Sequence, residues 1–187
     1  MRRAALGWKT HSGWAALVVL AAEGRTIEVL DRRRVELVDP ADVYWAKQPY
    51  HAAEGLDRED ARDVVKRAIA AAKRSAAREM RAALARAREA ELAIAACGVV
   101  AGAPMPAWSV DEILAVHFRM HKAEGVLWSD ALLGAAAACD LRAVAVREKK
   151  PEDRIARLGK SIGPPWGADQ KQAAAAALAS LSAKEGV

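Results

Sequence analysis

The first forty residues contain three short apolar segments that are separated by two tight turns. Residues 4–9 and 14–22 are compact apolar runs, and residues 10–13 (Thr-His-Ser-Gly) have the composition of a turn. Residues 23–24 (Glu-Gly) turn the chain again into a third segment at 26–38. Neighbouring strands joined by such short turns can only be antiparallel. The sequence therefore predicts a three-stranded antiparallel unit at the start of the chain.

After this unit, helical and strand patterns alternate along the chain. Apolar residues three and four apart, with acidic residues in the first turn, predict a long helix. Ser109 and Glu112 have the capping-box spacing that begins a second helix. The expected elements are a loop at 40–56, a helix at 57–89, a strand at 92–101, a helix at 109–139, a strand at 141–146 and helices within 151–183.

This order predicts an α/β fold with one mixed sheet. Three antiparallel strands come first, helix and strand then alternate, and the long apolar strands must be covered by helices on both faces. A chain of 187 residues is expected to form a single domain, residues 1–187. Its parts are the strand unit at 1–39, the loop at 40–56, the helix-strand-helix-strand segment at 57–147 and the C-terminal helices at 151–183.

The composition of the chain limits the kinds of partner and the cellular compartment that are expected for this protein. The formal charge of +5 is compatible with a polyanionic partner without requiring one. Cys97 and Cys139 lack metal-ligand spacing and sit among alanines, which favours buried free thiols in a reducing, cytoplasmic compartment. The apolar runs are too short for an export signal or a membrane span, so a soluble protein is expected. No phosphate-binding glycine motif is present, and no cofactor is predicted.

The predicted element order resembles the ribonuclease H-like fold, and residues 6–15 (LGWKTHSGWA) resemble the first hairpin of Holliday-junction resolvases and their relatives. In that family an aspartate ends the first strand, a glutamate ends the fourth, and two acidic residues lie on the last helix. Together they hold two magnesium ions that activate water against phosphodiesters. A hard divalent ion needs such oxygen ligands.

The resemblance places four residues of this chain at the metal-ligand positions. Lys9 stands where the first aspartate would be, Ala96 or Cys97 near the glutamate, Asp169 at the first helical acid and Gln172 at the second. One carboxylate of four remains, which predicts that two-metal cleavage has been lost. The same placement puts Lys9 within reach of Asp169 and predicts an ion pair between them.

Two other groups of residues are candidates for a site. The first is an anion-binding pocket, which converging strand ends would form and to which the first turn would add a hydroxyl and an imidazole. The candidate residues of this pocket are Lys9, Thr10, His11, Ser12, His51 and Lys160. The second group is His117, His121 and Glu124, which share one helical face and have zinc-ligand chemistry, with His11 or His51 as a further ligand. Packing against the sheet or against the loop at 44–51 explains the same spacing, and no metal is predicted.

These observations favour a ribonuclease H-like protein that has lost its nuclease centre and acts as a binding or scaffolding module. Nucleic acid is the first partner to test, because the outer face of the helix at 57–89 is basic; its residues are Arg62, Lys66, Lys73, Arg74, Arg78 and Arg81. One alternative is an enzyme that uses the histidine site or the Lys9 and His11 pocket. Another is a protein-binding module, including a homodimer, built from tryptophan-containing loops and the alanine-rich last helix.

Overall fold

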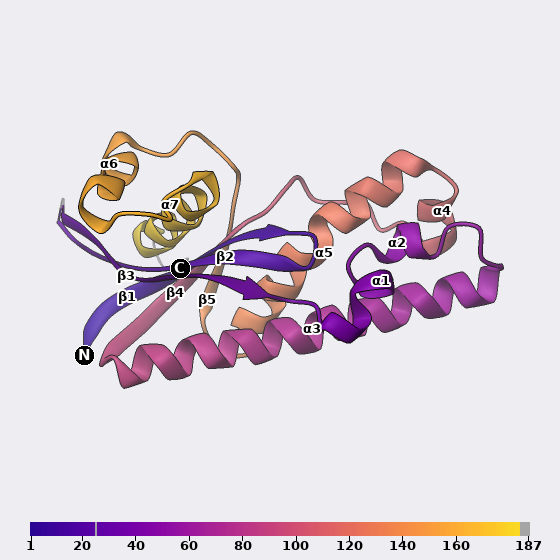
Figure 1. Ribbon diagram of the computed structural model, residues 1–187, viewed down its shortest axis with the longest axis horizontal. Helices are drawn as coiled ribbons and strands as arrows, with labels where there is room; N and C mark the ends of the chain where they lie inside the picture. Colours follow the sequence, from indigo (N-terminus) through magenta and orange to yellow (C-terminus); the bar gives the residue numbers. More distant parts are fainter. Residues whose placement is uncertain (25, 184–187) are drawn as a thin grey trace.

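The chain folds around one five-stranded mixed sheet, seen in a computed structural model that describes residues 1–24 and 26–183 (Figure 1). The strand order is β3-β2-β1-β4-β5. The first three strands are antiparallel, whereas β4 pairs parallel with β1 and β5 parallel with β4. The strands are β1 (Arg2–His11), β2 (Trp14–Glu23), β3 (Thr26–Glu36), β4 (Leu92–Val100) and β5 (Arg142–Val146). This confirms the predicted α/β class and its ribonuclease H-like arrangement of strands.

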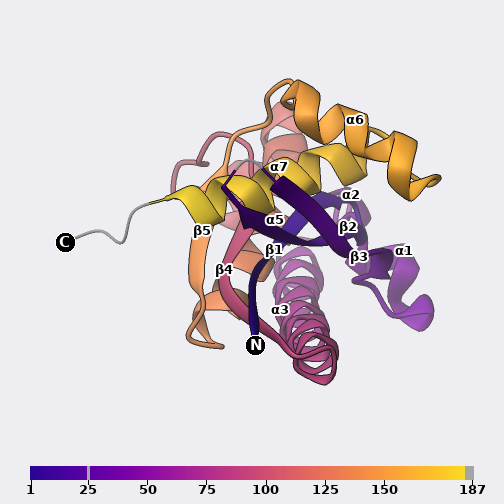
Figure 2. The same cartoon turned by 90° about the vertical axis from the view of Figure 1, so that its left-hand side faces the viewer.

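Helices cover both faces of the sheet, as predicted. The long helices α3 (Arg58–Glu89) and α5 (His117–Ala137) pack on one face, and α7 (Ala168–Ser182) packs on the other, with α6 (Asp153–Ile162) beside it (Figures 1 and 2). Asp57 caps α3 by accepting hydrogen bonds from two backbone N–H groups of its first turn. Within the described residues, no helix is both long and apolar enough to cross a membrane.

The period-two pattern of β1 divides the core between the two faces. Leu6 and Trp8 are fully buried in the cluster beneath α3 and α5, whereas Ala5 is buried in the cluster beneath α7. Cys97 of β4 belongs to the cluster beneath α3 and α5, where burial raises the pKa of its thiol to about 12. The two cysteines are free thiols, as expected, although Cys139 is only half-buried.

Helix α7 approaches the sheet closely because two glycines face it. A Cβ at Gly7 would lie 1.9 Å from the carbonyl oxygen of Ala173, and one at Gly98 would lie 2.0 Å from that of Ala176. The buried residues of α7 are mostly small and include Ala173, Ala176 and Ala177. Backbone therefore packs against backbone, and α7 lies closer to β1 and β4 than a residue with a Cβ at either position would allow.

Two expected elements differ in the structure. The segment at 40–56, expected as a loop, contains three short helices: η1 (Pro40–Asp42), α1 (Val43–Ala46) and α2 (Pro49–Ala52). The helix expected at 109–139 is divided into α4 (Val110–Leu114) and α5, because Val116 is extended, with φ −141° and ψ 112°. The Ser109 and Glu112 capping box forms as predicted. Apolar spacing continues across the break, so the sequence pattern did not reveal it.

We expect Gly7→Ala to lower the free energy of unfolding by at least about 2–3 kcal/mol, because the new methyl group meets backbone atoms that cannot rotate away. Gly134→Ala is the matched control. A Cβ at this α5 position meets nothing within 4 Å, and the change should raise stability by about 0.5–1 kcal/mol. Urea denaturation measures both. Equal effects of the two substitutions would contradict the close approach of α7.

Candidate functional site

The candidate site lies where the carboxyl end of β1 meets the first turn of α7. Gly7 contacts Ala173, and His11, four residues further along β1, contacts Asp169, four residues earlier in α7. The helix therefore runs antiparallel to β1. Lys9 and His11 alternate with Trp8, so their side chains lie on the same face of the sheet as α7. The fold thus places the end of β1, with Lys9 and His11, beside the first turn of α7, with Asp169.

Lys9 forms an ion pair with Glu148, a residue that follows β5. Its Nζ lies 2.6 Å from Oε2 of Glu148, and the two side chains are 17% and 59% exposed. Both line an open cleft of about 370 Å³ whose charged residues are Lys9, Arg147 and Glu148. Thr10 and Gly125 also line it, from β1 and α5. Two cations and one carboxylate therefore meet at this cleft.

The expected ion pair between Lys9 and Asp169 does not occur within the described residues, because each side chain has another partner. Asp169 lies 2.8 Å from Nε2 of His11. The His11 ring stacks on Trp14, with 4.3 Å between ring centroids and 13° between planes. The guanidinium of Arg34 lies 3.8 Å from the centroid of the same indole. The imidazole is therefore held from two sides, by a carboxylate and by an aromatic ring.

Cys97 and Gln172, the residues expected at the fourth-strand and second helical positions, are both buried. Lys9 pairs in register with Val100, three residues beyond Cys97. Cys97 is buried on the opposite face, beneath α3 and α5, so it does not reach the cleft. Gln172 is buried, and its Nε2 donates to the backbone carbonyl of Lys149 at 2.8 Å. That amide holds the segment after β5 instead of lining an open site.

The proposed anion pocket is only partly assembled. Lys9 and Thr10 line the cleft, and His11 and Ser12 continue from β1 into the adjoining turn. His51 lies elsewhere, in α2, and the exposed Lys160 lies in α6. The sequence analysis missed Glu148. Its only local signal is its position just beyond a strand that runs parallel to β1 and β4.

Three of the four histidines in the chain converge at a second place, between α2 and the start of α5. One ligand nitrogen from each of His51, His117 and His121 lies within 4.8 Å of the others. Glu124 is not positioned as a fourth ligand. Its carboxylate accepts hydrogen bonds from the N–H groups of Tyr50 and His51 at 3.1 Å, and Oε2 lies 2.8 Å from Nδ1 of His51. Burial and the Glu124 charge raise the pKa of the Tyr50 phenol.

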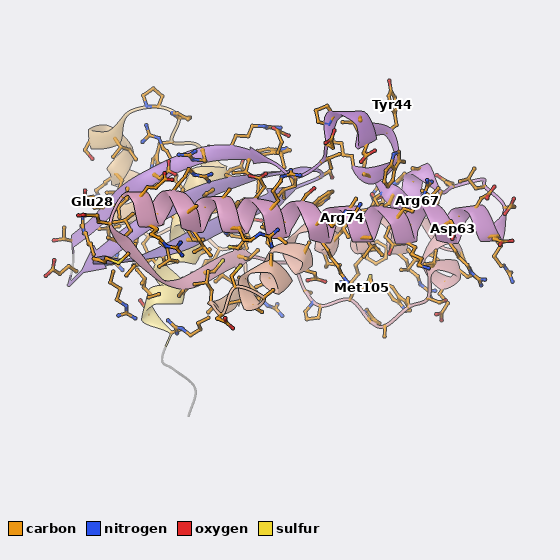
Figure 3. All side chains as sticks on the ribbon, turned by 90° about the horizontal axis from the view of Figure 1, so that it is seen from below. Glu28, Tyr44, Asp63, Arg67, Arg74 and Met105 are labelled. Carbon is orange, nitrogen blue, oxygen red and sulfur yellow. The ribbon has the colours of Figure 1, made fainter. Side chains whose placement is uncertain are left out.

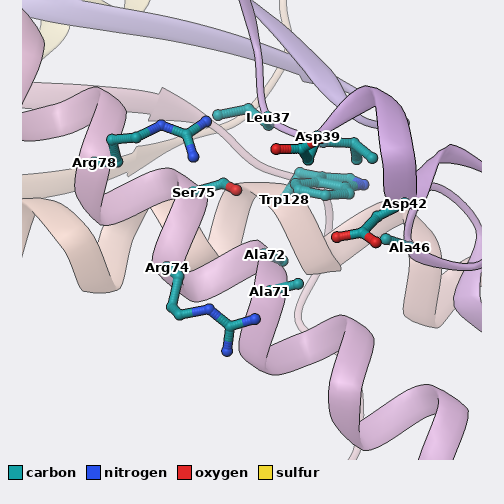
Figure 4. A pocket seen from close by; sticks show the side chains of 11 residues that line it. Leu37, Asp39, Asp42, Ala46, Ala71, Ala72, Arg74, Ser75, Arg78 and Trp128 are labelled. Atoms are coloured by element: carbon teal, nitrogen blue, oxygen red, sulfur yellow. The ribbon is translucent and has the colours of Figure 1, made fainter.

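A third hollow, of about 200 Å³, lies between α3, α5 and the chain that follows β3. Asp39 and Asp42 lie on one side, Arg74 and Arg78 project from α3, and the Trp128 indole forms the floor (Figure 4). Acidic and basic side chains thus face one another across it. These residues come from three distant segments, so no local pattern in the sequence could have predicted the hollow.

Comparison with known proteins found similar chains among the solved structures. No protein-family model and no curated protein matches the sequence. Among solved structures, Thermus thermophilus RuvC is similar at 15% identity and a TM-score of 0.49, covering 94% of this chain and 91% of that one. T. thermophilus RuvC in complex with Holliday junction substrate is similar at 15% identity and a TM-score of 0.47, with 94% and 90% covered. The fold assignment rests on the strand order and pairing seen in this chain.

We expect Lys9→Met to lower the free energy of unfolding by less than about 1 kcal/mol, because its partner Glu148 is largely in water. His11→Ala should cost more, since it removes the partner of Asp169 together with a stacked ring. Lys160→Met, at an exposed position of α6, is the control for loss of a lysine. Chemical denaturation compares the three. A larger loss for Lys9→Met than for His11→Ala would contradict these pairings.

Proposed function

We propose that residues 1–187 form one ribonuclease H-like domain that has lost two-metal catalysis and works as a nucleic-acid-binding module. The observation that carries the loss of catalysis is the ion pair between Lys9 and Glu148 at the end of β1. Two divalent cations bound together require several clustered carboxylates. Here one carboxylate of the cleft is neutralised by Lys9, and Asp169 is engaged by His11.

The charges around the cleft support the same conclusion. Lys9 and Arg147 place two positive groups beside Glu148, and like charges at such range repel an incoming cation. Gln172 supplies a neutral amide that is already committed to the Lys149 carbonyl. The cleft is therefore better suited to meeting an anion, such as a phosphate, than to holding magnesium.

The outer face of α3 supplies an extended basic surface, which we call the α3 basic stripe. Arg67, Arg74, Arg81 and Arg88 follow one another at intervals of seven residues, so they lie along one side of the helix about 10 Å apart. Each is exposed. Figure 3 looks onto α3, with Arg67 and Arg74 labelled. A regular row of cations at this spacing matches a repeating polyanion better than a small ligand.

The ion pairs of α3 involve arginines outside the stripe, although Asp39 and Asp42 line the same hollow as Arg74. Arg58 and Arg62 bind Asp111, and Arg78 binds Glu79. The stripe arginines form no ion pair with any residue that the structure describes. Lys66 and Lys73, one position before Arg67 and Arg74, widen the positive surface. Neutralising phosphates with such groups releases counterions, which favours binding at low salt.

The alternative of a protein-binding module on the last helix has less support. The alanine-rich face of α7 is buried against the sheet, and the Trp166 indole donates to the carbonyl of Ile155 at 3.0 Å. Trp45 is half-buried, with Arg67 above its ring. These groups are used within the fold, whereas Arg74, Arg81 and Arg88 of the stripe are exposed and form no ion pair with any described residue.

Binding to nucleic acid should depend on the α3 basic stripe. We expect the protein to bind double-stranded DNA with a Kd of about 10⁻⁴ to 10⁻⁶ M near physiological salt, and more tightly as salt is lowered. Arg74→Glu/Arg81→Glu should weaken binding and reduce the slope of log K against log salt by about 2. Arg154→Glu/Arg157→Glu on α6 changes the net charge equally and is the matched control.

Fluorescence anisotropy over a salt series measures all three proteins. Absence of binding at low salt would end the nucleic-acid proposal. An equal loss in the α6 control would show that net charge acts instead of the stripe.

The loss of catalysis is tested separately. With Mg²⁺ or Mn²⁺, the purified protein should leave branched and duplex DNA intact, because the cleft lacks the carboxylates that two metals require. Gel analysis of end-labelled DNA provides the measurement. Asp169→Asn controls for a contaminating nuclease. Metal-dependent scission by the unchanged protein that disappears in Asp169→Asn would overturn the proposal.

A further inference from the structure

We infer that His51, His117 and His121 form a binding site for a divalent transition metal of the zinc class, with Glu124 as a positioning residue for His51. The site is independent of the proposed nucleic-acid role. It uses none of the residues of the Lys9 cleft or of the α3 basic stripe.

The break between α4 and α5 helps to set the position of two of the histidines. Val116 is extended, so α5 begins anew at His117. His117 and His121 are one helical turn apart, and their Nε2 atoms lie 3.0 Å from each other. Two imidazole nitrogens bound to one tetrahedral zinc at 2.0–2.1 Å lie about 3.3 Å apart. This pair is therefore already close to the separation that a shared metal imposes.

His51 completes the group from a different part of the chain. Its ring centroid lies 5.4 Å from that of His117 and 4.8 Å from that of His121. The ligand nitrogens of all three fall within 4.8 Å. A contraction of about 1–1.5 Å would bring the most distant pair to the tetrahedral separation. Rotation of the exposed His117 and His121 side chains can supply such a change without moving the backbone.

Glu124 gives His51 the orientation that a metal ligand needs. Its carboxylate lies 2.8 Å from Nδ1 of His51. In a neutral imidazole whose Nδ1–H donates to this carboxylate, Nε2 carries the lone pair that can bind a metal. The Glu124 side chain is only 5% exposed and is fixed by two backbone N–H groups. Metal-bound histidines typically donate their second nitrogen to a carboxylate in this way.

Local packing alone explains only part of this arrangement. Glu124 satisfies backbone N–H groups in α2, and His51 satisfies Glu124 in return. Neither contact requires His117 and His121 to turn toward His51. Hydrogen bonding links His121 to His117, but each of these exposed rings could equally use water. The convergence of all three on one point is what a shared metal ion would explain.

The donor set selects the class of ion. Imidazole nitrogen suits zinc and its neighbours among the late first-row metals, whereas magnesium and calcium require oxygen ligands. Three protein ligands leave a fourth tetrahedral position, which here faces solvent because His117 and His121 are exposed. Gly125, one turn after His121, lines the Lys9 cleft. Helix α5 therefore contributes His121 to the histidine cluster and Gly125, one turn later, to the lining of the Lys9 cleft.

The test is titration of the metal-free protein with ZnCl₂, followed by equilibrium dialysis with elemental analysis. We expect one Zn²⁺ per chain and no competition from millimolar Mg²⁺. At 100 times the Kd, bound Zn²⁺ should raise the Tm by about 5–10 °C. Co²⁺ should occupy the same site and give visible absorption bands of a tetrahedral complex.

Variants separate this site from incidental binding. His121→Ala and His117→Gln, both at exposed positions, should abolish stoichiometric binding while circular dichroism stays unchanged. Glu124→Gln should weaken Zn²⁺ affinity by about 10- to 100-fold, as expected for a group that orients a ligand. His11→Ala is the matched control, because His11 is the fourth histidine and also contacts a carboxylate. It should bind Zn²⁺ as the unchanged protein does.

The contrary results are equally specific. Absence of Zn²⁺ binding, or binding that survives His121→Ala, would overturn the site. Loss of binding in His11→Ala with the fold intact would assign the metal to the end of β1 instead. Failure of the DNA experiments leaves these outcomes unaffected, because they use Zn²⁺ alone as the probe.

Discussion

The close contact between α7 and the two glycines of the sheet determines where the chemistry of this chain can occur. Gly7 and Gly98 have no Cβ, so the backbone of α7 lies directly on β1 and β4. That contact sets how closely the helix approaches the sheet. The first turn of α7 lies at the end of β1, where Asp169 meets His11. A bulkier residue at either glycine would push α7 away from the sheet and so disturb the contact between Asp169 and His11.

At that end, each carboxylate pairs with a basic side chain of β1. A carboxylate cluster would repel itself unless cations were bound, and here the cations come from the chain. Lys9 neutralises Glu148, and His11 approaches Asp169 while stacked on Trp14. Because these pairs are partly exposed, each contributes little to stability. Their effect is on what the cleft attracts, since Lys9 and Arg147 leave it positive next to a single acidic group.

The parts of the fold that sequence reasoning predicted are those whose signals lie within a few residues. The β1–β2 turn, the long helix predicted at 57–89 and the Ser109 and Glu112 capping box all have local signals, and the structure contains each of them. Partners across the fold were not predictable in this way. Lys9 and Glu148 are 139 residues apart, and no pattern near Glu148 marks it as a partner. The expected Lys9 and Asp169 pair failed because proximity of two elements does not decide which side chains meet.

The histidine cluster shows why the short helices after β3 matter. His117 and His121 share a helical face, and the sequence alone reveals that spacing. His51 joins them only because the segment expected as a loop folds into α1 and α2. Glu124 anchors α2 by accepting hydrogen bonds from two of its backbone N–H groups. A buried carboxylate needs such partners, so the same interaction stabilises α2 and aims the His51 ring. A metal ion at this point would connect two segments, α2 and α5, that the central sheet does not hold together.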